Sequence, residues 1–450
     1  MRYFSLIISA FVLLSLKMPA RAQQVYRLTL SKAVEMARKE NTKVRNANYD
    51  IDIARKKVWE TTSIGLPQVS TSLSYKNNID LPVTLVPAKI FNPQAGDDEF
   101  MELKFGVQHN VMLNLQVNQL IFNGSYIVGL KTSKIFKQMA EENKIKTEND
   151  VVAQTTQTYN TILFSLKNKV ILKHTLDDIA KTYEELKATY KAGLAEETAV
   201  DQILLNKLTV ENAIRSIDRQ ITVQLNLLKI QMGVDFNDSL VINDSLDLVF
   251  ENAHVEKALY QDFDMSKNPD YMVMSTKEKI DEKQVSLAKM SLLPSVNAFF
   301  SHNQSGQSDD FTFFNSDQKW FPSNVIGASL VIPITTSGGN IAKIKEAELN
   351  LRKTQNNKKL LEQNLLLSVS TARNKLIKEY ETYLTQKQNV VLAEKIYKRS
   401  LVKFKQGMIS SAELTQVNTQ YYNSQSLYYA AILNVLNAKA ALDKILGNNF

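Results

Sequence analysis

The aspartate, glutamate and histidine side chains are the ones that could bind a metal ion or catalyse a reaction in this chain. Their spacing argues against both roles. Four aspartates follow one another near the middle of the chain, where a calcium site is conceivable: Asp235, Asp238, Asp244 and Asp247. The run lacks the glycine and the closing glutamate that a calcium-binding loop needs at ligand spacing. The histidines have no serine or carboxylate partner at a recognisable spacing: His109, His174, His254 and His302. The sequence therefore predicts no metal site, no cofactor and no enzyme.

Other kinds of chemistry are excluded by composition. The chain has no cysteine, which removes disulfides, thiolate metal sites, a cysteine nucleophile and a lipid-bearing N-terminal cysteine. No phosphate-binding glycine loop or nucleophile elbow is present. The net charge of +8 is small for 450 residues, and Lys and Glu alternate along helical segments as they do on solvated faces. This pattern does not favour nucleic-acid binding.

The first 22 residues have the pattern of a secretory signal peptide. Arg2 gives a basic start, residues 4–16 are mostly apolar, and Ala20-Arg21-Ala22 matches a cleavage site. The alternative, a transmembrane helix, needs about twenty apolar residues. We therefore expect an exported mature chain that begins near Gln23, with a net charge reduced to +5 by the loss of three basic residues.

One motif occurs twice and organises the rest of the chain. Residues 190–208 read YKAGLAEETAVDQILLNKL, and residues 404–422, shifted by 214 positions, read FKQGMISSAELTQVNTQYY. Each copy has an aromatic residue, then a glycine three positions later (Gly193, Gly407), then a polar loop and an apolar periodic run. A glycine in this position is typical of a helix C-terminus in the left-handed conformation. Each copy is predicted to be the tip of a helical hairpin.

The segments that flank the tips are predicted to be long, coiled-coil-like helices. Residues 130–192, 194–232, 340–406 and 408–446 contain no Gly or Pro. Within them apolar residues recur at steps of three and four, and both halves share one register over more than four heptads. The register positions in the second half are 414, 417, 421, 424, 428, 431, 435, 438, 442 and 445, and those in the first half lie 214 residues earlier.

The repeat extends upstream to two helix-to-strand junctions. Leu66-Pro67 corresponds to Leu293-Pro294 at a shift of 227, so the first half is 13 residues longer between its proline and its tip. A helix is predicted before each proline, over Thr29–Ile64 and over about Asn268–Leu292, where Asn-Pro is a good helix start.

After each proline the apolar period changes to two, which predicts β-strands. Residues 107–118 alternate between an apolar face and an amide-rich face over the length of a membrane strand. Shorter alternation over 69–75, 295–302 and 325–332 predicts three further strands, with loops over Asn77–Phe105 and Asn303–Asn324. An amphipathic sheet on a soluble core and a water-filled membrane barrel both fit this pattern. The length of the strands favours the barrel.

These elements predict a duplicated chain in three parts. A first repeat covers residues 23–233, with a β-hairpin over 68–122 and a tip near 193. A linker packed around the helices follows over 234–262. A second repeat covers 263–450, with a β-hairpin over 295–333 and a tip near 407. Four strands cannot close a barrel, and open edges are too costly in lipid, so the strands must be shared between subunits.

With these features the chain resembles a known family, the TolC-like outer-membrane efflux proteins. The resemblance rests on the LTLSKAVEMARKEN opening (Leu28–Asn41), the leucine-proline junctions and the duplicated aromatic-x-x-Gly tips. It implies a mainly α fold with membrane β: a homotrimer whose twelve-stranded barrel in the outer membrane of a Gram-negative cell continues into an α-barrel tunnel in the periplasm. The implied function is the passive exit duct of tripartite efflux or type I secretion. A periplasmic adaptor (membrane fusion protein) and an inner-membrane transporter are the implied partners.

The resemblance also assigns roles to tip residues. Gly193-Leu194 and Gly407-Met408 map to the tips that dock the adaptor and close the tunnel, and simple turn geometry is the alternative. Two acidic residues three positions apart often face the pore at the second tip of the family. Here Glu413 matches the first and Gln416 replaces the second, which leaves one negative charge per subunit. Helix capping is the alternative role for Glu413.

The closing contacts between helices in the family would fall at residues of this chain that carry no hydroxyl and no charge: Phe404, Ile409 and Ala199. If the tunnel closes, the sequence predicts that it does so by apolar packing. A periplasmic coiled-coil adaptor or structural protein is the competing interpretation of the whole chain. Such a protein would keep the heptads and lack the paired amphipathic strands.

Overall fold

The computed structural model describes residues 24–448, so the signal peptide predicted over 1–22 lies outside the described residues. Its helices and strands follow one another in this order: β1 (Val25–Leu28), α2 (Leu30–Glu40), α3 (Thr42–Ser63), β2 (Gln68–Asn77), β3 (Val83–Pro87), η1 (Ala88–Ile90), β4 (Phe100–Lys104), β5 (His109–Phe122), α4 (Gly124–Lys191), α5 (Glu197–Met232), β6 (Ser239–Ile242), α6 (Leu246–Glu251), α7 (Val255–Leu259), η2 (Met265–Lys267), α8 (Pro269–Met290), β7 (Ser295–Ser308), β8 (Trp320–Val331), α9 (Gly339–Lys405) and α10 (Ser411–Leu446).

The described residues form two compact units, each built from both halves of the chain. We call residues 51–140 and 274–357 the sheet unit. The remaining described residues, 24–50, 141–273 and 358–448, form the helical unit. The long helices α4 and α9 contribute residues to both units.

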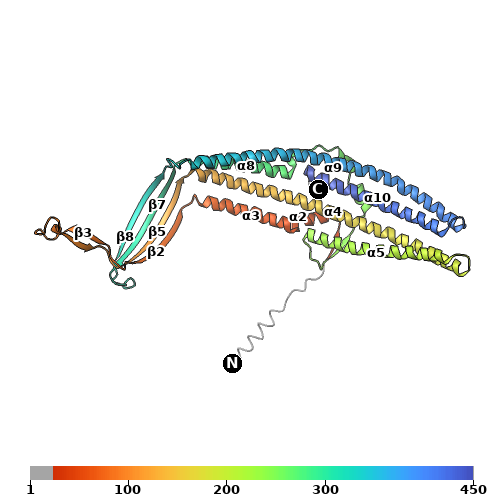
Figure 1. The fold of residues 1–450 in the computed structure, drawn as a ribbon, viewed down its shortest axis with the longest axis horizontal. Coiled ribbons are helices and arrows are strands. Elements are labelled where there is room, and N and C mark those ends of the chain that lie inside the picture. Colours follow the sequence, from red (N-terminus) through yellow and green to blue (C-terminus); the bar gives the residue numbers. More distant parts are fainter. Residues whose placement is uncertain (1–23, 449–450) are drawn as a thin grey trace, which may run out of the picture. The chain divides into compact units, whose positions relative to one another are not determined.

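The sheet unit contains a four-stranded antiparallel sheet in the order β2-β5-β7-β8 (Figure 1). All four predicted strands are confirmed, and all four are longer than the alternation indicated. Both prolines lie just before a strand, where the missing N–H costs no ladder bond. At the first junction the Gln119 amide donates to the Gly65 carbonyl at 2.8 Å, and the Tyr126 hydroxyl donates to the Thr62 carbonyl at 3.2 Å. These bonds fix the end of α3 against the start of α4.

The strand register gives the sheet two chemically different faces. Ser70 and Ser72 pair with Gln116 and Asn114, and Asn114 pairs with Asn303, so hydroxyl and amide side chains share one face. The opposite face carries mostly apolar residues, among them Val69, Leu73, Val111, Leu113, Leu115, Phe300, Ile326 and Leu330. Leu73 is 70% exposed and Ile326 84%, so this apolar face is uncovered in the single chain. The predicted alternation is confirmed, although His302 and Gln304 also lie on the apolar face.

A two-stranded ribbon replaces the loop predicted between the first two strands of the sheet. β3 pairs antiparallel with β4, from Val83 opposite Lys104 to Pro87 opposite Phe100. The loop prediction was wrong because Pro82 and Pro87, which suggested irregular chain, stand at the two ends of β3, where proline is tolerated.

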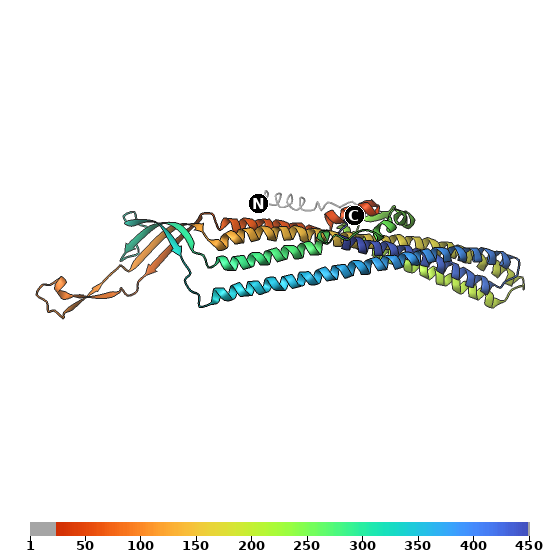
Figure 2. The same ribbon diagram turned by 90° about the horizontal axis from the view of Figure 1, so that it is seen from above.

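The helical unit is built on two hairpins, α4–α5 and α9–α10, whose helices lie side by side in both views (Figures 1 and 2). None of the twenty predicted register positions is exposed. Nine of them are buried: Val200, Ile203, Ile221, Leu228, Leu414, Ala431, Val435, Ala438 and Leu442. The predicted heptad seam is therefore confirmed as the packed side of α5 and α10.

The helix predicted over Thr29–Ile64 is two helices, α2 and α3, which meet at Asn41. Asn41 has an extended backbone (φ −57°, ψ 131°), its side-chain oxygen accepts the Lys43 N–H at 2.8 Å, and its amide donates to the Gln231 carbonyl at 2.7 Å. The prediction of one helix was wrong because the break depends on this contact with the end of α5, far along the chain.

The second half repeats the same joint. The Asn268 oxygen accepts the Asp270 N–H at 3.0 Å, which caps the predicted helix α8, and its amide donates to the Ile445 carbonyl at 2.9 Å. The two asparagines are 227 residues apart and the two carbonyls 214 apart, the same two shifts that relate the sequence repeats. We call these contacts the first and second joint.

The segment 234–262 has regular structure of its own. β6 pairs in parallel with β1, and α6 and α7 follow it. Each of the four aspartates makes a structural contact: Asp238 with the Gln24 N–H, Asp244 with the Leu30 N–H, Asp247 with the Lys167 ammonium, and Asp235 with the Asn237 N–H. The first three of these carboxylates anchor the segment to its neighbours, and that of Asp235 forms a turn within it.

Candidate functional site

The two hairpin tips contain most of the residues that the sequence assigned to function. α4 and α9 end in the left-handed conformation, at Gly193 (φ 74°) and Gly407 (φ 71°). The Leu194 N–H donates to the Thr189 carbonyl at 3.0 Å, and the Met408 N–H donates to the Lys403 carbonyl at 2.9 Å. Together with the glycine N–H bonds to the preceding turn, these are Schellman caps. The predicted tip geometry is confirmed at both places.

Backbone conformation, and not crowding, explains the glycines at the tips. A Cβ added to Gly193 or Gly407 would meet no atom within 4 Å. The next residue in each tip is apolar and points into open space, with Leu194 80% exposed and Met408 69% exposed. Each hairpin thus ends in a rigid turn with one protruding apolar side chain. Docking of an adaptor at these four residues stays a prediction.

The gate candidates lie around the second tip. Ser410 caps α10, with its hydroxyl accepting the Glu413 N–H at 3.2 Å. Glu413 and Gln416 are exposed, whereas Phe404 in the last turn of α9 is half-buried. The capping bond comes from the Ser410 side chain, and the Glu413 carboxylate makes no ion pair with any described residue. The structure brings these residues to one end of one hairpin, and their role in gating stays a prediction.

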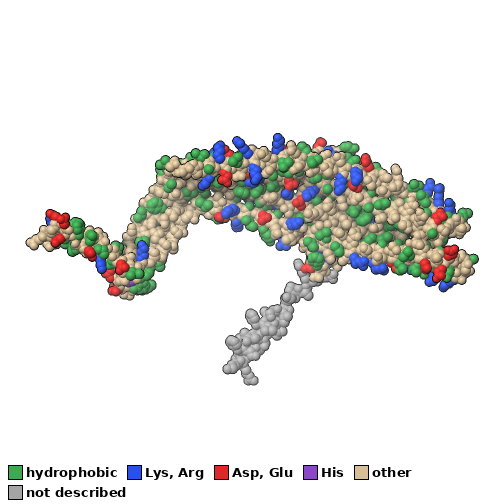
Figure 3. Space-filling model, viewed as in Figure 1, with side chains coloured by type: hydrophobic (Ala, Val, Ile, Leu, Met, Phe, Trp, Pro, Cys, Tyr) green, Lys and Arg blue, Asp and Glu red, His purple; other side chains and the backbone are tan. Residues whose placement is uncertain are grey.

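Charged side chains gather at the ends of the hairpins (Figure 3). In residues 177–201, Asp and Glu outnumber Lys by seven to three. In the matching residues 391–415, Lys and Arg outnumber Glu by five to two. The two tips therefore share a backbone geometry and differ in charge.

A partly buried polar contact between the two hairpins was missed from the sequence. Asp178 of α4 accepts hydrogen bonds on Oδ2 from the Tyr397 hydroxyl of α9 at 3.2 Å and the Tyr422 hydroxyl of α10 at 3.3 Å. The ring of Tyr421 stacks on that of Tyr397, with centroids 5.3 Å apart and planes 13° apart. Asp178 lies beside the apolar Ile179, and nothing in the local sequence distinguishes it from a solvated surface aspartate.

Burial raises the pKa of both tyrosines. Desolvation, followed by the negative charge of Asp178, raises the pKa of Tyr397 to about 12. Desolvation also raises the pKa of Tyr422. Both hydroxyls therefore stay protonated at neutral pH and donate to the carboxylate, which makes the contact a stable link between the hairpins.

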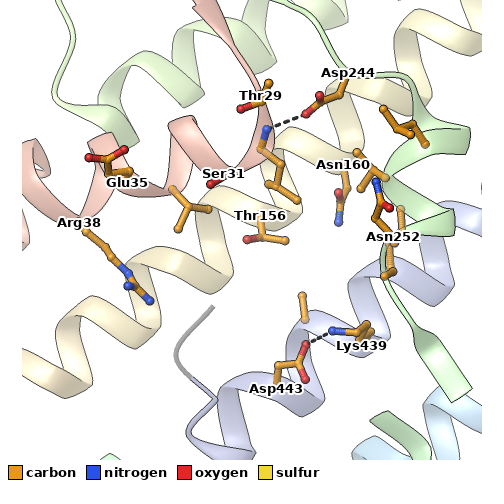
Figure 4. Close-up of a pocket in the computed structure, with 17 residues that line it drawn as sticks. Thr29, Ser31, Glu35, Arg38, Thr156, Asn160, Asp244, Asn252, Lys439 and Asp443 are labelled. Carbon is orange, nitrogen blue, oxygen red and sulfur yellow. Dashed lines mark hydrogen bonds and ion pairs between the residues drawn. The ribbon is translucent and has the colours of Figure 1, made fainter. Parts of the chain in front are cut away.

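A cavity of about 570 Å³ lies in the helical unit beside α2, α4, α6 and α10 (Figure 4). Three of the charged groups that line it are engaged in structural bonds: Asp244 accepts the Leu30 N–H at 2.7 Å and the hydroxyl of the buried Tyr159 at 2.9 Å, and Lys439 contacts Asp443 at 2.5 Å. Arg38 and Asn160 also line the cavity (Figure 4). The contacts of Asp244 hold α2, α4 and the 234–262 segment together, and the described residues of the lining include no nucleophile paired with a base.

Residues 24–448 contain no candidate metal centre and no candidate membrane-spanning helix. No three or more His, Asp or Glu side chains in this range lie close enough together to hold a metal ion. None of the helices in the same range is both long enough and apolar enough to cross a membrane.

Comparison with known sequences identifies the second half of the chain. Residues 265–448 match the outer membrane efflux protein family. No curated protein sequence matches the chain.

Solved structures resemble nearly the whole chain. The outer membrane channel CmeC of Campylobacter jejuni is 18% identical, with a TM-score of 0.71 over 94% of this chain and 86% of that chain. VceC of Vibrio cholerae is 15% identical, with a TM-score of 0.70 over 94% and 96%. The open state of the MtrE channel of Neisseria gonorrhoeae is 14% identical, with a TM-score of 0.70 over 93% and 88%. The TM-scores over nearly the whole chain establish a shared fold.

The family match and the shared fold agree with the resemblance seen in the sequence. Residues 265–448 match the outer membrane efflux protein family, and the chain as a whole shares its fold with the solved outer membrane channels CmeC and MtrE.

Proposed function

We propose that this chain is the outer-membrane exit duct of a tripartite efflux or type I secretion system. Three copies form a twelve-stranded barrel in the outer membrane, continued by an α-helical tunnel in the periplasm. The duct conducts substrates passively to the exterior. A periplasmic adaptor and an inner-membrane transporter supply contact and energy.

The observation that carries this proposal is the pair of open sheet edges. In the order β2-β5-β7-β8, the outer edges of β2 and β8 have no partner strand among residues 24–448. Unpaired backbone groups cost several kcal/mol each in lipid, about the cost of burying an amide without a partner. Single-chain barrels begin at about eight strands, so four strands from one chain cannot close. Pairing of β8 with β2 of a second copy removes both edges, and three copies give a barrel of twelve strands.

The two faces of the sheet support the same arrangement. The apolar face with Leu73 and Ile326 suits contact with lipid, and the face with Ser72, Asn114 and Asn303 suits a water-filled interior. The Asn114 amide donates to the Ser301 hydroxyl at 2.9 Å and also contacts Asn303, so polar groups on this face satisfy one another. A coiled-coil adaptor or structural protein has no use for such a sheet.

The two hairpin tips form the periplasmic mouth of the tunnel in this proposal. Gly193-Leu194 and Gly407-Met408 dock the adaptor, supported by the protruding Leu194 and Met408 side chains. Glu413 and Gln416 line the mouth, and Phe404 packs beside it when the tunnel closes.

The test is the behaviour of the full-length protein in an outer-membrane fraction. We expect detergent extraction of a complex of three copies that migrates faster before heating than after, and discrete conductance steps in a planar bilayer. A Thr71→Pro variant removes one N–H from the edge strand β2, and a Ser323→Pro variant does the same on β8; both should lower the yield of the complex. A soluble periplasmic product without conductance would support the coiled-coil alternative and overturn the proposal.

A further inference from the structure

The second tip carries a basic surface, and most of its charges form no ion pair among residues 24–448 that would stabilise the fold. Lys395, Lys398, Arg399, Lys403 and Lys405 are all exposed in the last turns of α9. Lys398 pairs with Glu394 on the same helix at 2.6 Å. Lys395, Arg399 and Lys403 make no ion pair with any described residue. Because they stand four positions apart in one row, their like charges destabilise the helix.

Apolar side chains alternate with these charges on the same side of α9. Val391 is 62% exposed, Leu392 58% and Val402 55%, and Met408 at the turn is 69% exposed. Their spacing of three and four from the basic residues places them on neighbouring rows of the helix. The opposite side of α9 is occupied by the buried Ala393 and the half-buried Tyr397 and Phe404, which face the hairpin. We call this exposed apolar and cationic side of residues 391–408 the basic tip surface.

The first tip shows that this charge is not a requirement of the hairpin geometry. Its cap and glycine conformation match those of the second tip, yet its exposed charges are mainly Glu184, Glu185, Glu196, Glu197 and Asp201. None of these five acids forms an ion pair with a described residue. The same backbone motif therefore carries opposite charge in the two halves of the chain (Figure 3).

We infer that the basic tip surface binds an acidic amphipathic helix of the periplasmic adaptor, an inference that rests on the duct function proposed above. Carboxylates four positions apart on that helix meet the row of Lys395, Arg399 and Lys403. Its apolar residues cover Val391, Leu392 and Val402. Complementary charge of this kind sets the orientation and register of a partner more than its affinity. The acidic first tip rejects the same helix, so the two tips distinguish two segments of the adaptor.

The experiment uses the full-length protein in detergent and two synthetic helical-hairpin peptides as probes. The peptides share one apolar face and carry either Glu or Lys at every solvent-facing position. The chain has no cysteine, so a Val402→Cys variant can be labelled at one place with a photo-crosslinker. We expect the acidic peptide to crosslink at residue 402 with an apparent affinity about tenfold higher than that of the basic peptide, and the difference to shrink as salt rises.

Charge reversal tests the named residues. The variant K395E/R399E/K403E should lose the preference for the acidic peptide at residue 402. The matched control R352E/K353E/K359E makes the same charge change at exposed positions of the same helix, far from the tip, and should keep the preference. If the triple variant folds poorly, Arg399→Glu alone should weaken crosslinking and Arg399→Lys should restore it.

Several outcomes would overturn the inference. These are equal crosslinking of both peptides at residue 402, an unchanged preference after charge reversal, or a crosslink from residue 402 to a second copy of this chain. Conductance of the same preparations is measured in parallel. Pores without a charge preference refute this inference alone, whereas a charge preference without pores refutes the duct function and leaves the surface as a helix-binding site.

Discussion

The hydroxyl of Tyr397 on α9 lies 3.2 Å from the Asp178 carboxylate on α4, so a residue before the second tip is bonded to a residue before the first. Tyr422 on α10 donates to the same oxygen. Three of the four helices that make up the hairpins therefore meet at one carboxylate. This contact links the hairpins near their tips, and the Lys444–Asp150 ion pair at 2.7 Å links α10 and α4 near the other end of α10.

Removal of the two donors should loosen this link. We expect Tyr397→Phe and Tyr422→Phe each to lower the stability of the helical unit by about 1–2 kcal/mol, since a hydrogen bond to a carboxylate is lost and the ring remains. Thermal unfolding of the detergent-solubilised protein measures the change. Tyr421→Phe is the control, because its hydroxyl only accepts from the Gln425 amide at 2.7 Å. Equal losses of stability in all three variants would show that the hydrogen bonds to the Asp178 carboxylate do not stabilise the helical unit.

The same tyrosine predicts a dependence of stability on alkaline pH. Burial, with a smaller part from Asp178, raises the pKa of Tyr397 from 10.0 to about 12. Between these values the unfolded chain loses the phenolic proton while the folded chain keeps it. The stability from this group is therefore complete below about pH 10 and is lost as the pH rises toward about 12. Tyr397→Phe should show a shallower fall in unfolding temperature over this range than the unsubstituted protein, and parallel curves would contradict the assignment.

Glycine substitutions separate conformation from packing. Gly193→Ala and Gly407→Ala should each destabilise their hairpin by about 1 kcal/mol, because both positions have positive φ and open space around them. Gly129→Ala inside α4 also meets no atom within 4 Å and has no positive φ, so it should stabilise the protein by about 0.5–1 kcal/mol. Unfolding midpoints of the three variants test the comparison. A loss at Gly129 as large as at the tips would refute it.

Glu413 should influence divalent cations at the mouth of the pore. In single-channel recordings we expect Glu413→Ala to weaken block by divalent cations, and Gln416→Glu to strengthen it by adding a second carboxylate one turn away. Ser410→Ala removes the cap of α10, at a cost of about 1 kcal/mol, and should leave the block unchanged. An unaltered block curve for Glu413→Ala would give this residue a structural role only.

The sequence predicts the parts of this fold that depend on local pattern. Runs without Gly or Pro identify α5, α9 and α10 within a few residues, because nothing inside these runs interrupts the backbone bonds. The same signal identifies α4 except for its first turns, which contain Gly124 and Gly129. Alternation over 107–118 identifies β5, since its two faces meet different surroundings. The glycines at 193 and 407 locate the tips through their conformation alone.

Features that depend on distant contacts are not predictable in this way. Asn41 interrupts a good helical pattern only because the end of α5 offers it a carbonyl. The 234–262 segment is ordered by bonds from its aspartates to β1, α2 and α4. Asp178 is an ordinary surface residue by its sequence, and it acquires its two tyrosine donors only when the hairpins pack.

The two joints show the internal repeat of the chain at the level of single contacts. In each, an asparagine bonds a carbonyl at the end of a hairpin, and the glycine that follows, Gly233 or Gly447, has no room for a methyl group against Glu40 or Lys267. The two copies of the repeat are thus alike at the joints. They differ between their strands, where 31 residues connect β2 to β5 and include the β3–β4 ribbon, against 11 between β7 and β8. Asn41 and Asn268 make equivalent contacts within one molecule. A substitution at one joint can therefore be compared with the same substitution at the other.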